Sequence, residues 1–183
     1  MGRKYAIRDQ EHLYFVTFTV IHWLDVFIRD EYRQVFTESL KYCQKEKGLI
    51  VGAWCLMTSH AHLILGSDGK MKLEDVIRDF KSFTSRHIRK AIEGNIKESR
   101  KEWMLKAMKK AGSEKSNNKD FQFWVQNNHP IELNTNEMVD SRLDYIHQNP
   151  VVAGFVEEPR EWKYSSARDY EGEKGLIDIL FLD

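Results

Sequence analysis

Two histidines, His60 and His62, stand one residue apart at the start of an apolar run that follows the polar pair Thr58-Ser59. Successive side chains of a β-strand point to opposite faces, so residues i and i+2 share one face. If this run is a strand, the two imidazoles lie side by side and can hold one divalent ion. Two ordinary strand histidines produce the same pattern, and the spacing alone favours that simpler interpretation unless a third ligand exists.

A second pair of polar side chains lies near the end of the chain. Tyr145 and Asn149 are four residues apart in a segment with helical periodicity. That spacing places them on one face of a helix, with β-carbons about 5–6 Å apart. Asn149 is therefore a candidate third ligand, and Tyr145 is a candidate nucleophile beside it. The competing interpretation makes Tyr145 a core residue and Asn149 a C-cap before Pro150, and the residues alone favour it.

Hydrophobic periodicity predicts the elements that must position these side chains. Alternating patterns indicate strands over 13–20, 49–56 and 61–65, and a fourth strand or an extended segment over 121–125. Helical spacing indicates helices over about 31–46, after the loop 66–70, and over about 137–148, where Pro150 should end the last one. This order predicts an α+β fold: a ferredoxin-like antiparallel sheet with helices packed on one face, plus a C-terminal helix that bears Tyr145.

Length and composition predict one folded domain over residues 1–183. The chain is 42% hydrophobic and 31% charged, which is typical of globular proteins rather than of disordered or membrane chains. No apolar run is long enough to span a bilayer, and the first residues lack a secretory signal. The two cysteines suit buried thiols in a reducing compartment. We therefore expect a cytoplasmic protein with no membrane partner.

The formal net charge is zero, but the charge is unevenly distributed. The segment 78–119 contains 13 Lys and Arg residues against 5 Asp and Glu. A basic block of this kind is typical of a phosphate-binding face, and solvated lysines along a helix give the same count equally well. Its second part, residues 95–120, is predicted to be a basic and mobile insertion.

The residues around Tyr145 closely resemble those of a known family. The sequence LDYIHQNPVVAGFV at 143–156, followed by WKYSSA at 162–167, resembles the REP-associated tyrosine transposases. These belong to the single-tyrosine HUH nucleases, together with the small insertion-sequence transposases. The resemblance extends over nearly the whole chain and includes MTSHAH at 57–62. It implies that His60 and His62 are metal ligands, that Tyr145 is the catalytic residue, and that Asn149 completes the metal site.

The chain departs from the family pattern beside the first histidine. Thr58 and Ser59 stand where the family usually has proline and asparagine, and Ala61 is small for the middle position. Neither change removes a ligand.

The resemblance also implies the reaction: a metal-dependent transposase that cleaves and rejoins single-stranded DNA beside hairpin repeats through a 5′-phosphotyrosine. A phenol is a poor nucleophile near neutral pH, because its ordinary pKa is about 10. A divalent ion on three neutral ligands can polarise the scissile phosphate for its attack. Mixed nitrogen and oxygen ligands suit Mg²⁺ or Mn²⁺. The expected partner is hairpin-bearing single-stranded DNA, and the expected assembly is a monomer or a homodimer.

Two groups of residues are candidates for contacting that DNA. One follows the second helix, and the other resembles the basic and aromatic tail with which the family reads a short sequence beside the hairpin. The candidate DNA-binding residues are Arg3, Lys4, Tyr5, Lys81, Arg86 and Arg89.

Three other functions fit part of the sequence. A DNA-binding protein of the same fold could bind repeats without cleaving them, although the intact His60, His62, Tyr145 and Asn149 oppose this. A non-catalytic nucleic-acid-binding module of ferredoxin-like fold would stack bases on Tyr14, Phe15 and Phe18 and would need no metal. A metal-dependent hydrolase would activate water instead of Tyr145, and it would keep its activity in a Tyr145→Phe variant.

Overall fold

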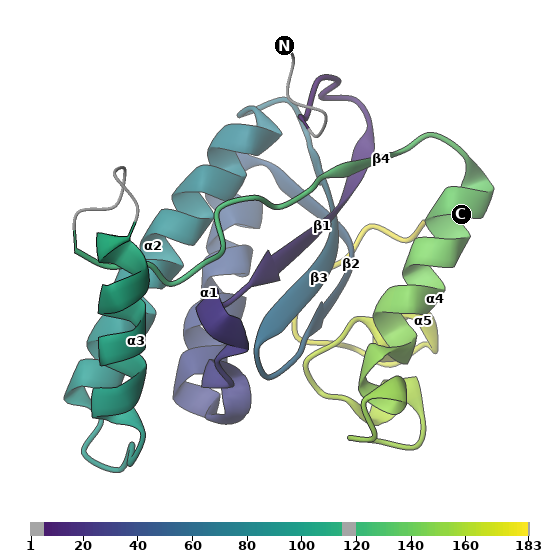
Figure 1. The fold of residues 1–183 in the computed structure, drawn as a ribbon. Helices are drawn as coiled ribbons and strands as arrows, with labels where there is room; N and C mark the ends of the chain where they lie inside the picture. The colour runs from purple at the N-terminus through teal and green to yellow at the C-terminus, as the bar shows by residue number, and fades with distance from the viewer. Residues whose placement is uncertain (1–5, 115–119, 183) are drawn as a thin grey trace.

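The computed structural model of the protein describes residues 6–114 and 120–182 (Figure 1). The proposed DNA contacts Arg3, Lys4 and Tyr5 lie outside these residues. A four-stranded antiparallel sheet occupies the centre, with strands in the order β2-β3-β1-β4. The strands are β1 Leu13–Thr19, β2 Leu49–Leu56, β3 His60–Ser67 and β4 Ile131–Leu133. The predicted α+β class is therefore confirmed, and the strand order is that of a ferredoxin-like sheet.

Helices α1 (Asp30–Lys47) and α2 (Leu73–Gly94) cover one face of the sheet. Alternate residues of the central strands, among them Val16, Phe18 and Leu63, point into the core beneath these helices. Gly48 ends α1 in the left-handed conformation (φ 72°), which costs glycine little because it has no Cβ. The chain then turns directly into β2.

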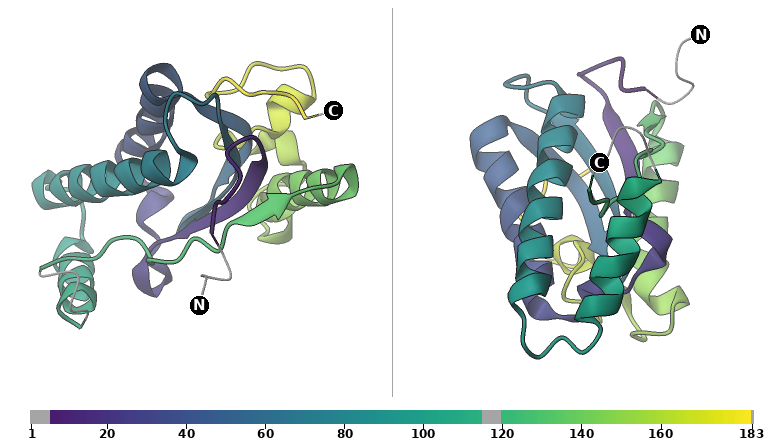
Figure 2. Two further views of the ribbon diagram at one scale, coloured as in Figure 1. Left: turned by 90° about the horizontal axis from the view of Figure 1, so that it is seen from above. Right: turned by 60° about the vertical axis from the view of Figure 1, so that its left-hand side comes forward.

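Helix α4 (Asn136–Val152) packs against the opposite face (Figures 1 and 2). Ile146 is its buried anchor, and it belongs to a second apolar cluster with Phe15 and Ile64. The sheet thus lies between α1 and α2 on one side and the tyrosine-bearing helix on the other. The histidine face of β3 is the face that α4 covers.

The segment predicted as a fourth strand has a different role. Residues 121–125 form only an isolated bridge between Val20 and Trp124, whereas the fourth strand is β4, further along the chain. Phe123 and Trp124 are buried in the core on the α1–α2 side. Their apolar character therefore serves side-chain packing, and of the two predicted alternatives the segment is extended rather than a strand of the sheet.

The segment 95–120, expected to be mobile, contains helix α3 (Lys101–Ser113). Met104 and Met108, one helical turn apart, are fully buried in the main core and hold α3 against the rest of the molecule. Glu98 anchors the preceding turn through ion pairs with Arg29 and Arg100. The basic residues of α3 occupy its solvent side, while residues 115–119 lie outside the described part.

Helix α4 also continues past the point where Pro150 was expected to end it. Thr135 caps its start by accepting a hydrogen bond from the Met138 amide. At its end, the amides of Gly154 and Phe155 bond to the carbonyls of Val151 and Pro150, and Gly154 has a positive φ of 75°. These two bonds form a Schellman motif, which closes the helix beyond the proline.

Short helices complete the fold: η1 Ile21–Trp23, η2 Val26–Ile28, η3 Pro159–Glu161 and α5 Ala167–Tyr170. Within residues 6–114 and 120–182, no helix combines the length and apolar character needed to cross a bilayer.

Candidate functional site

His60 and His62 lie on the same face of β3, as their spacing predicts. Their ring centroids are 4.8 Å apart. Strand β3 is paired with β1 on one side and β2 on the other, so the backbone that carries both rings is fixed. His62 is 6% exposed, and its ring stacks on Phe15 at a centroid distance of 5.7 Å.

Each histidine has a hydroxyl group beside its Nδ1 atom. Thr17 Oγ1 lies 2.9 Å from His62 Nδ1, and Ser59 Oγ lies 3.2 Å from His60 Nδ1. The tautomer with its proton on Nδ1 donates to the hydroxyl oxygen and leaves the Nε2 lone pair free for a metal ion.

Tyr145 reaches the histidines from the opposite side of the site. Its ring centroid lies 5.1 Å from that of His62 and 6.0 Å from that of Phe15, with both contacts close to edge-on. The side chain remains 46% exposed, so its contacts do not shield it from solvent. The structure therefore brings together, within one chain, the two groups that sequence analysis could only place on separate elements.

Asn149 joins the helix to the histidine pair. Its Nδ2 atom donates to the Tyr145 carbonyl at 2.9 Å, which leaves Oδ1 as the acceptor. Its side chain also hydrogen-bonds to His60, and this bond acts to raise the pKa of that imidazole. Because Nδ2 is bonded to the Tyr145 carbonyl, Oδ1 is the Asn149 atom that could serve as a third ligand.

Burial keeps both imidazoles neutral. Desolvation, with smaller contributions in the same direction from His60 and Arg142, lowers the pKa of His62 to about 3. Desolvation also lowers the pKa of His60, against the opposing effects of Asn149 and Asp25. The neutral form is the one that binds metals.

The chemistry of these donors fits a divalent ion held by two imidazole nitrogens and one amide oxygen. In the described part of the chain, no three His, Cys, Asp or Glu side chains cluster in a way that could hold a metal. A metal site at this position therefore depends on the amide of Asn149.

The C-terminal segment holds α4 in place. His147, on α4, lies 2.9 Å from Ser166 Oγ through its Nε2 atom, and the same hydroxyl accepts a hydrogen bond from the Trp54 amide on β2. In the sequence, the serine pair is notable only as part of the family resemblance, and no pattern marks Thr17 or His147 as supporting residues. No local pattern indicates such contacts, because each joins segments distant in sequence.

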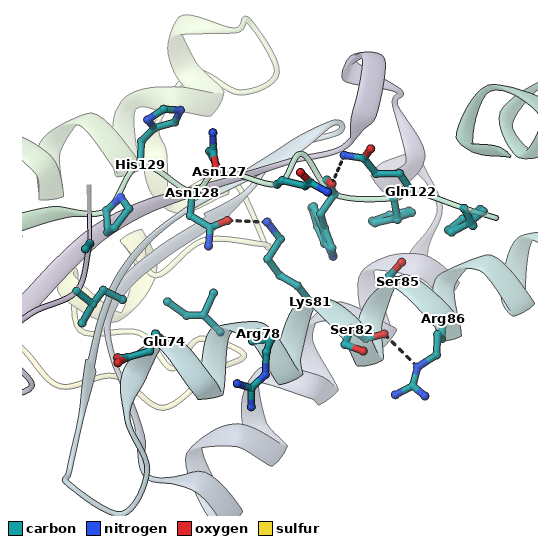
Figure 3. Close-up of a pocket in the computed structure, with 18 of the residues that line it drawn as sticks. Glu74, Arg78, Lys81, Ser82, Ser85, Arg86, Gln122, Asn127, Asn128 and His129 are labelled. Atoms are coloured by element: carbon teal, nitrogen blue, oxygen red, sulfur yellow. Dashed lines mark hydrogen bonds between the residues drawn. The ribbon is translucent and has the colours of Figure 1, made fainter. Parts of the chain in front are cut away.

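The predicted DNA-binding residues of the second helix lie elsewhere. Lys81, Arg86 and Arg89 line a groove of about 1090 Å³ between α2 and the segment 121–130 (Figure 3). Lys81 bonds to the Val125 carbonyl at 2.7 Å and lies over the ring of Phe18, on the sheet face opposite Tyr145. The groove is therefore separate from the histidine site, and DNA contact there stays a prediction.

The three rings that the alternative nucleic-acid-binding module would use for stacking are not accessible in the described structure. Tyr14, Phe15 and Phe18 are all buried, because helices cover both faces of the sheet. The expectation that these rings stack bases was wrong.

The chain is similar to transposases in sequence and in fold. The model of a family described as "Transposase IS200 like" matches residues 11–128, which include both histidines but not Tyr145. A solved structure of a REP-associated tyrosine transposase bound to a REP hairpin is similar in fold, with a TM-score of 0.66 and 14% identity over 100% of this chain and 96% of that one. A putative transposase from Deinococcus radiodurans gives a TM-score of 0.46 and 17% identity over 81% and 95%. No curated protein matches the chain.

Proposed function

Because this chain belongs to the IS200-like transposase family, we propose that it is a metal-dependent single-tyrosine nuclease that cleaves and rejoins single-stranded DNA beside hairpin repeats. The observation that carries this proposal is the position of Tyr145. Its ring lies 5.1 Å from His62 while 46% of the side chain remains exposed to solvent. The phenol is therefore both beside the histidine pair and accessible to a DNA strand.

We propose that His60, His62 and Asn149 hold Mg²⁺ or Mn²⁺ through two Nε2 atoms and one amide oxygen. When bound, the ion supplies positive charge that polarises the scissile phosphate. Neutral ligands leave the ion's charge undiminished. Thr17 and Ser59 orient the two imidazoles, and the Asn149–Tyr145 contact fixes the amide relative to the nucleophile.

In the proposed reaction, the Tyr145 oxygen forms a bond to phosphorus and the bond from phosphorus to the 3′ oxygen breaks. The phenolic proton leaves to water, and the departing 3′ oxygen gains a proton. The products are a 5′-phosphotyrosine and a free 3′-hydroxyl. One phosphodiester replaces another, so a 3′-hydroxyl can reverse the step and rejoin a strand without ATP.

The substrate is proposed by similarity of fold. The solved structure with the same fold is bound to a REP hairpin, and we propose a hairpin-bearing single strand for this chain as well. All four site residues come from one chain, which supports a monomer that is complete in itself. A homodimer that exchanges α4 is the alternative assembly, and the cytoplasm is the proposed location.

The test is the covalent intermediate itself. Wild-type protein is incubated with Mn²⁺ and hairpin-bearing single strands taken from beside its own gene, and the products are separated under denaturing conditions. We expect a protein–DNA adduct from wild type and none from Tyr145→Phe. DNA cleavage that persists in Tyr145→Phe would instead establish a hydrolase, and the absence of an adduct on every strand would refute the proposal.

A further inference from the structure

Trp23 extends the row of aromatic rings at the site. Its ring centroid lies 5.2 Å from that of His60, with the two planes at 70°. Together with the 4.8 Å and 5.1 Å distances along His60, His62 and Tyr145, this places Trp23 next to the histidine pair at the end away from the nucleophile. Trp23 is nevertheless 62% exposed, so much of the indole is open to solvent.

The backbone at this position is strained. His22 and Trp23 have φ angles of 53° and 54°, in the left-handed region that side chains with a Cβ seldom adopt. The residues on either side, Ile21 and Leu24, are buried, and the Leu24 amide bonds to the Ile21 carbonyl across the turn. The fold therefore maintains two unfavourable conformations, and their effect is to project Trp23 outward. Strain of this kind is often found at functional sites.

The loop that carries Trp23 is fixed to the turn before His60. The Val20 amide donates to the Ser59 carbonyl at 2.9 Å, and the Phe27 amide donates to the Thr58 carbonyl at 2.8 Å. In addition, Thr58 Oγ1 donates to Asp25 Oδ1 at 2.6 Å. These bonds lie before and after Trp23, so its position relative to His60 is set on both sides.

We propose that Trp23 stacks an unpaired base of the DNA strand next to the scissile phosphate. This inference rests on the proposed function, because it needs a nucleic-acid strand at the histidine pair. A near-perpendicular contact with His60 occupies at most one face of the indole, and the high exposure leaves the other face for a base. Stacking on an aromatic ring accepts any base, because every base has a π-face. Trp23 thus fixes the position of the strand without reading its sequence.

The experiment measures binding in the absence of cleavage. In a Tyr145→Phe background, Trp23→Ala and Trp23→Phe are compared for affinity to a hairpin-bearing single strand from beside the protein's own gene. The same strand is then made with one abasic position at a time. Tyr42→Ala is the matched control, because Tyr42 is 59% exposed on α1, on the other face of the sheet. Circular dichroism verifies that each variant is folded.

We expect Trp23→Ala to weaken binding roughly 5- to 150-fold, the usual range for loss of one stacked base. Trp23→Phe should retain most of the affinity, and Tyr42→Ala all of it. One abasic position should weaken binding to the protein that retains Trp23 but cause no further loss in Trp23→Ala. The proposal would be overturned if Trp23→Ala bound as tightly as the protein that retains Trp23. It would also be overturned if, at every abasic position, the loss from the missing base and the loss from Trp23→Ala were independent and multiplied. Failure of the Tyr145→Phe protein to bind any such strand would also overturn it.

The adduct assay separates this result from the proposed function. If wild type forms the adduct but no abasic position has a smaller effect in Trp23→Ala than in the protein that retains Trp23, only the stacking role is refuted. Coupling without an adduct supports the stacking role and refutes strand cleavage by Tyr145.

Discussion

Thr17 and His62 are directly opposite each other in the β1–β3 pair, and their side chains meet with Oγ1 and Nδ1 2.9 Å apart. The contact fixes the ring of a buried histidine from the neighbouring strand. Partners of this type set both the tautomer and the orientation of metal-binding histidines.

Thr17→Val should therefore weaken the metal site while preserving the fold. Valine is close to threonine in shape and favours strands, but it cannot accept a hydrogen bond from Nδ1. We expect Mn²⁺ affinity to fall roughly 10- to 100-fold, measured by electron paramagnetic resonance of the free ion. Thr19→Val is the control, since Thr19 lies on the same face of β1, opposite His60. Equal losses in both variants would show that the Thr17 hydroxyl has no specific role.

A second prediction concerns acid stability. The Glu98 side chain is fully buried. Desolvation acts to raise its pKa, but hydrogen bonds from Arg100 and Arg29 outweigh this and lower the pKa to about 2. A carboxyl whose pKa is depressed in the folded state contributes stability above its unfolded pKa of about 4.5 and loses that contribution as the pH falls towards 2. The contribution is on the order of 3 kcal/mol.

Glu98→Gln should therefore lose stability at pH 7 and show a flatter pH profile between about 4.5 and 2 than wild type. Urea unfolding at a series of pH values measures this. Glu93→Gln is the matched control, because its ion pair with Arg89 is exposed and should contribute little. Parallel pH profiles for wild type and Glu98→Gln would show that the acid sensitivity arises elsewhere.

The groove beside α2 gives a third prediction. Arg86 is exposed there, with its Nε donating to the Ser82 carbonyl at 3.2 Å (Figure 3). If the groove contacts a DNA backbone, Arg86→Ala should weaken binding of hairpin-bearing single strands of different sequence about equally. It should also reduce the salt dependence of the affinity by about one phosphate contact. Lys45→Ala, an exposed cation on α1, should change neither quantity. An unchanged salt slope in Arg86→Ala would place the DNA elsewhere.

Local patterns predicted much of the fold. Alternation located β1, β2 and β3 to within two residues, and helical spacing located α1 and α2, because each pattern is contained in the element itself. The fourth strand was misplaced, since Phe123 and Trp124 are apolar for packing and the pairing of β4 with β1 joins residues more than a hundred positions apart. Pro150 was expected to stop α4, but the helix continues to Val152. It ends in the two hydrogen bonds from the Gly154 and Phe155 amides, which the positive φ of Gly154 permits.

In the candidate site too, relationships within one element could be predicted and contacts between elements could not. The spacing of His60 and His62 and that of Tyr145 and Asn149 were each readable, because each pair lies on one element. Their contact across the sheet face is tertiary, and spacing alone favoured structural roles for both pairs. No sequence pattern indicated a role for Trp23, because one tryptophan predicts neither the exposure of its side chain nor a left-handed backbone conformation.

Asn149 gives the last prediction, because the metal site in the described chain has no third ligand from His, Cys, Asp or Glu. Asn149→Ala removes the amide oxygen beside His60 and the bond to the Tyr145 carbonyl. The site should then retain only two protein ligands, so Mn²⁺ affinity and the rate of adduct formation should fall together. Asn149→Asp keeps an oxygen at the same position and adds a negative charge. It should bind Mn²⁺ more tightly than wild type yet form adduct more slowly, because the added charge offsets the ion's pull on the phosphate. Loss of adduct in Asn149→Ala with unchanged Mn²⁺ affinity would show instead that the amide positions Tyr145 and does not ligate the ion.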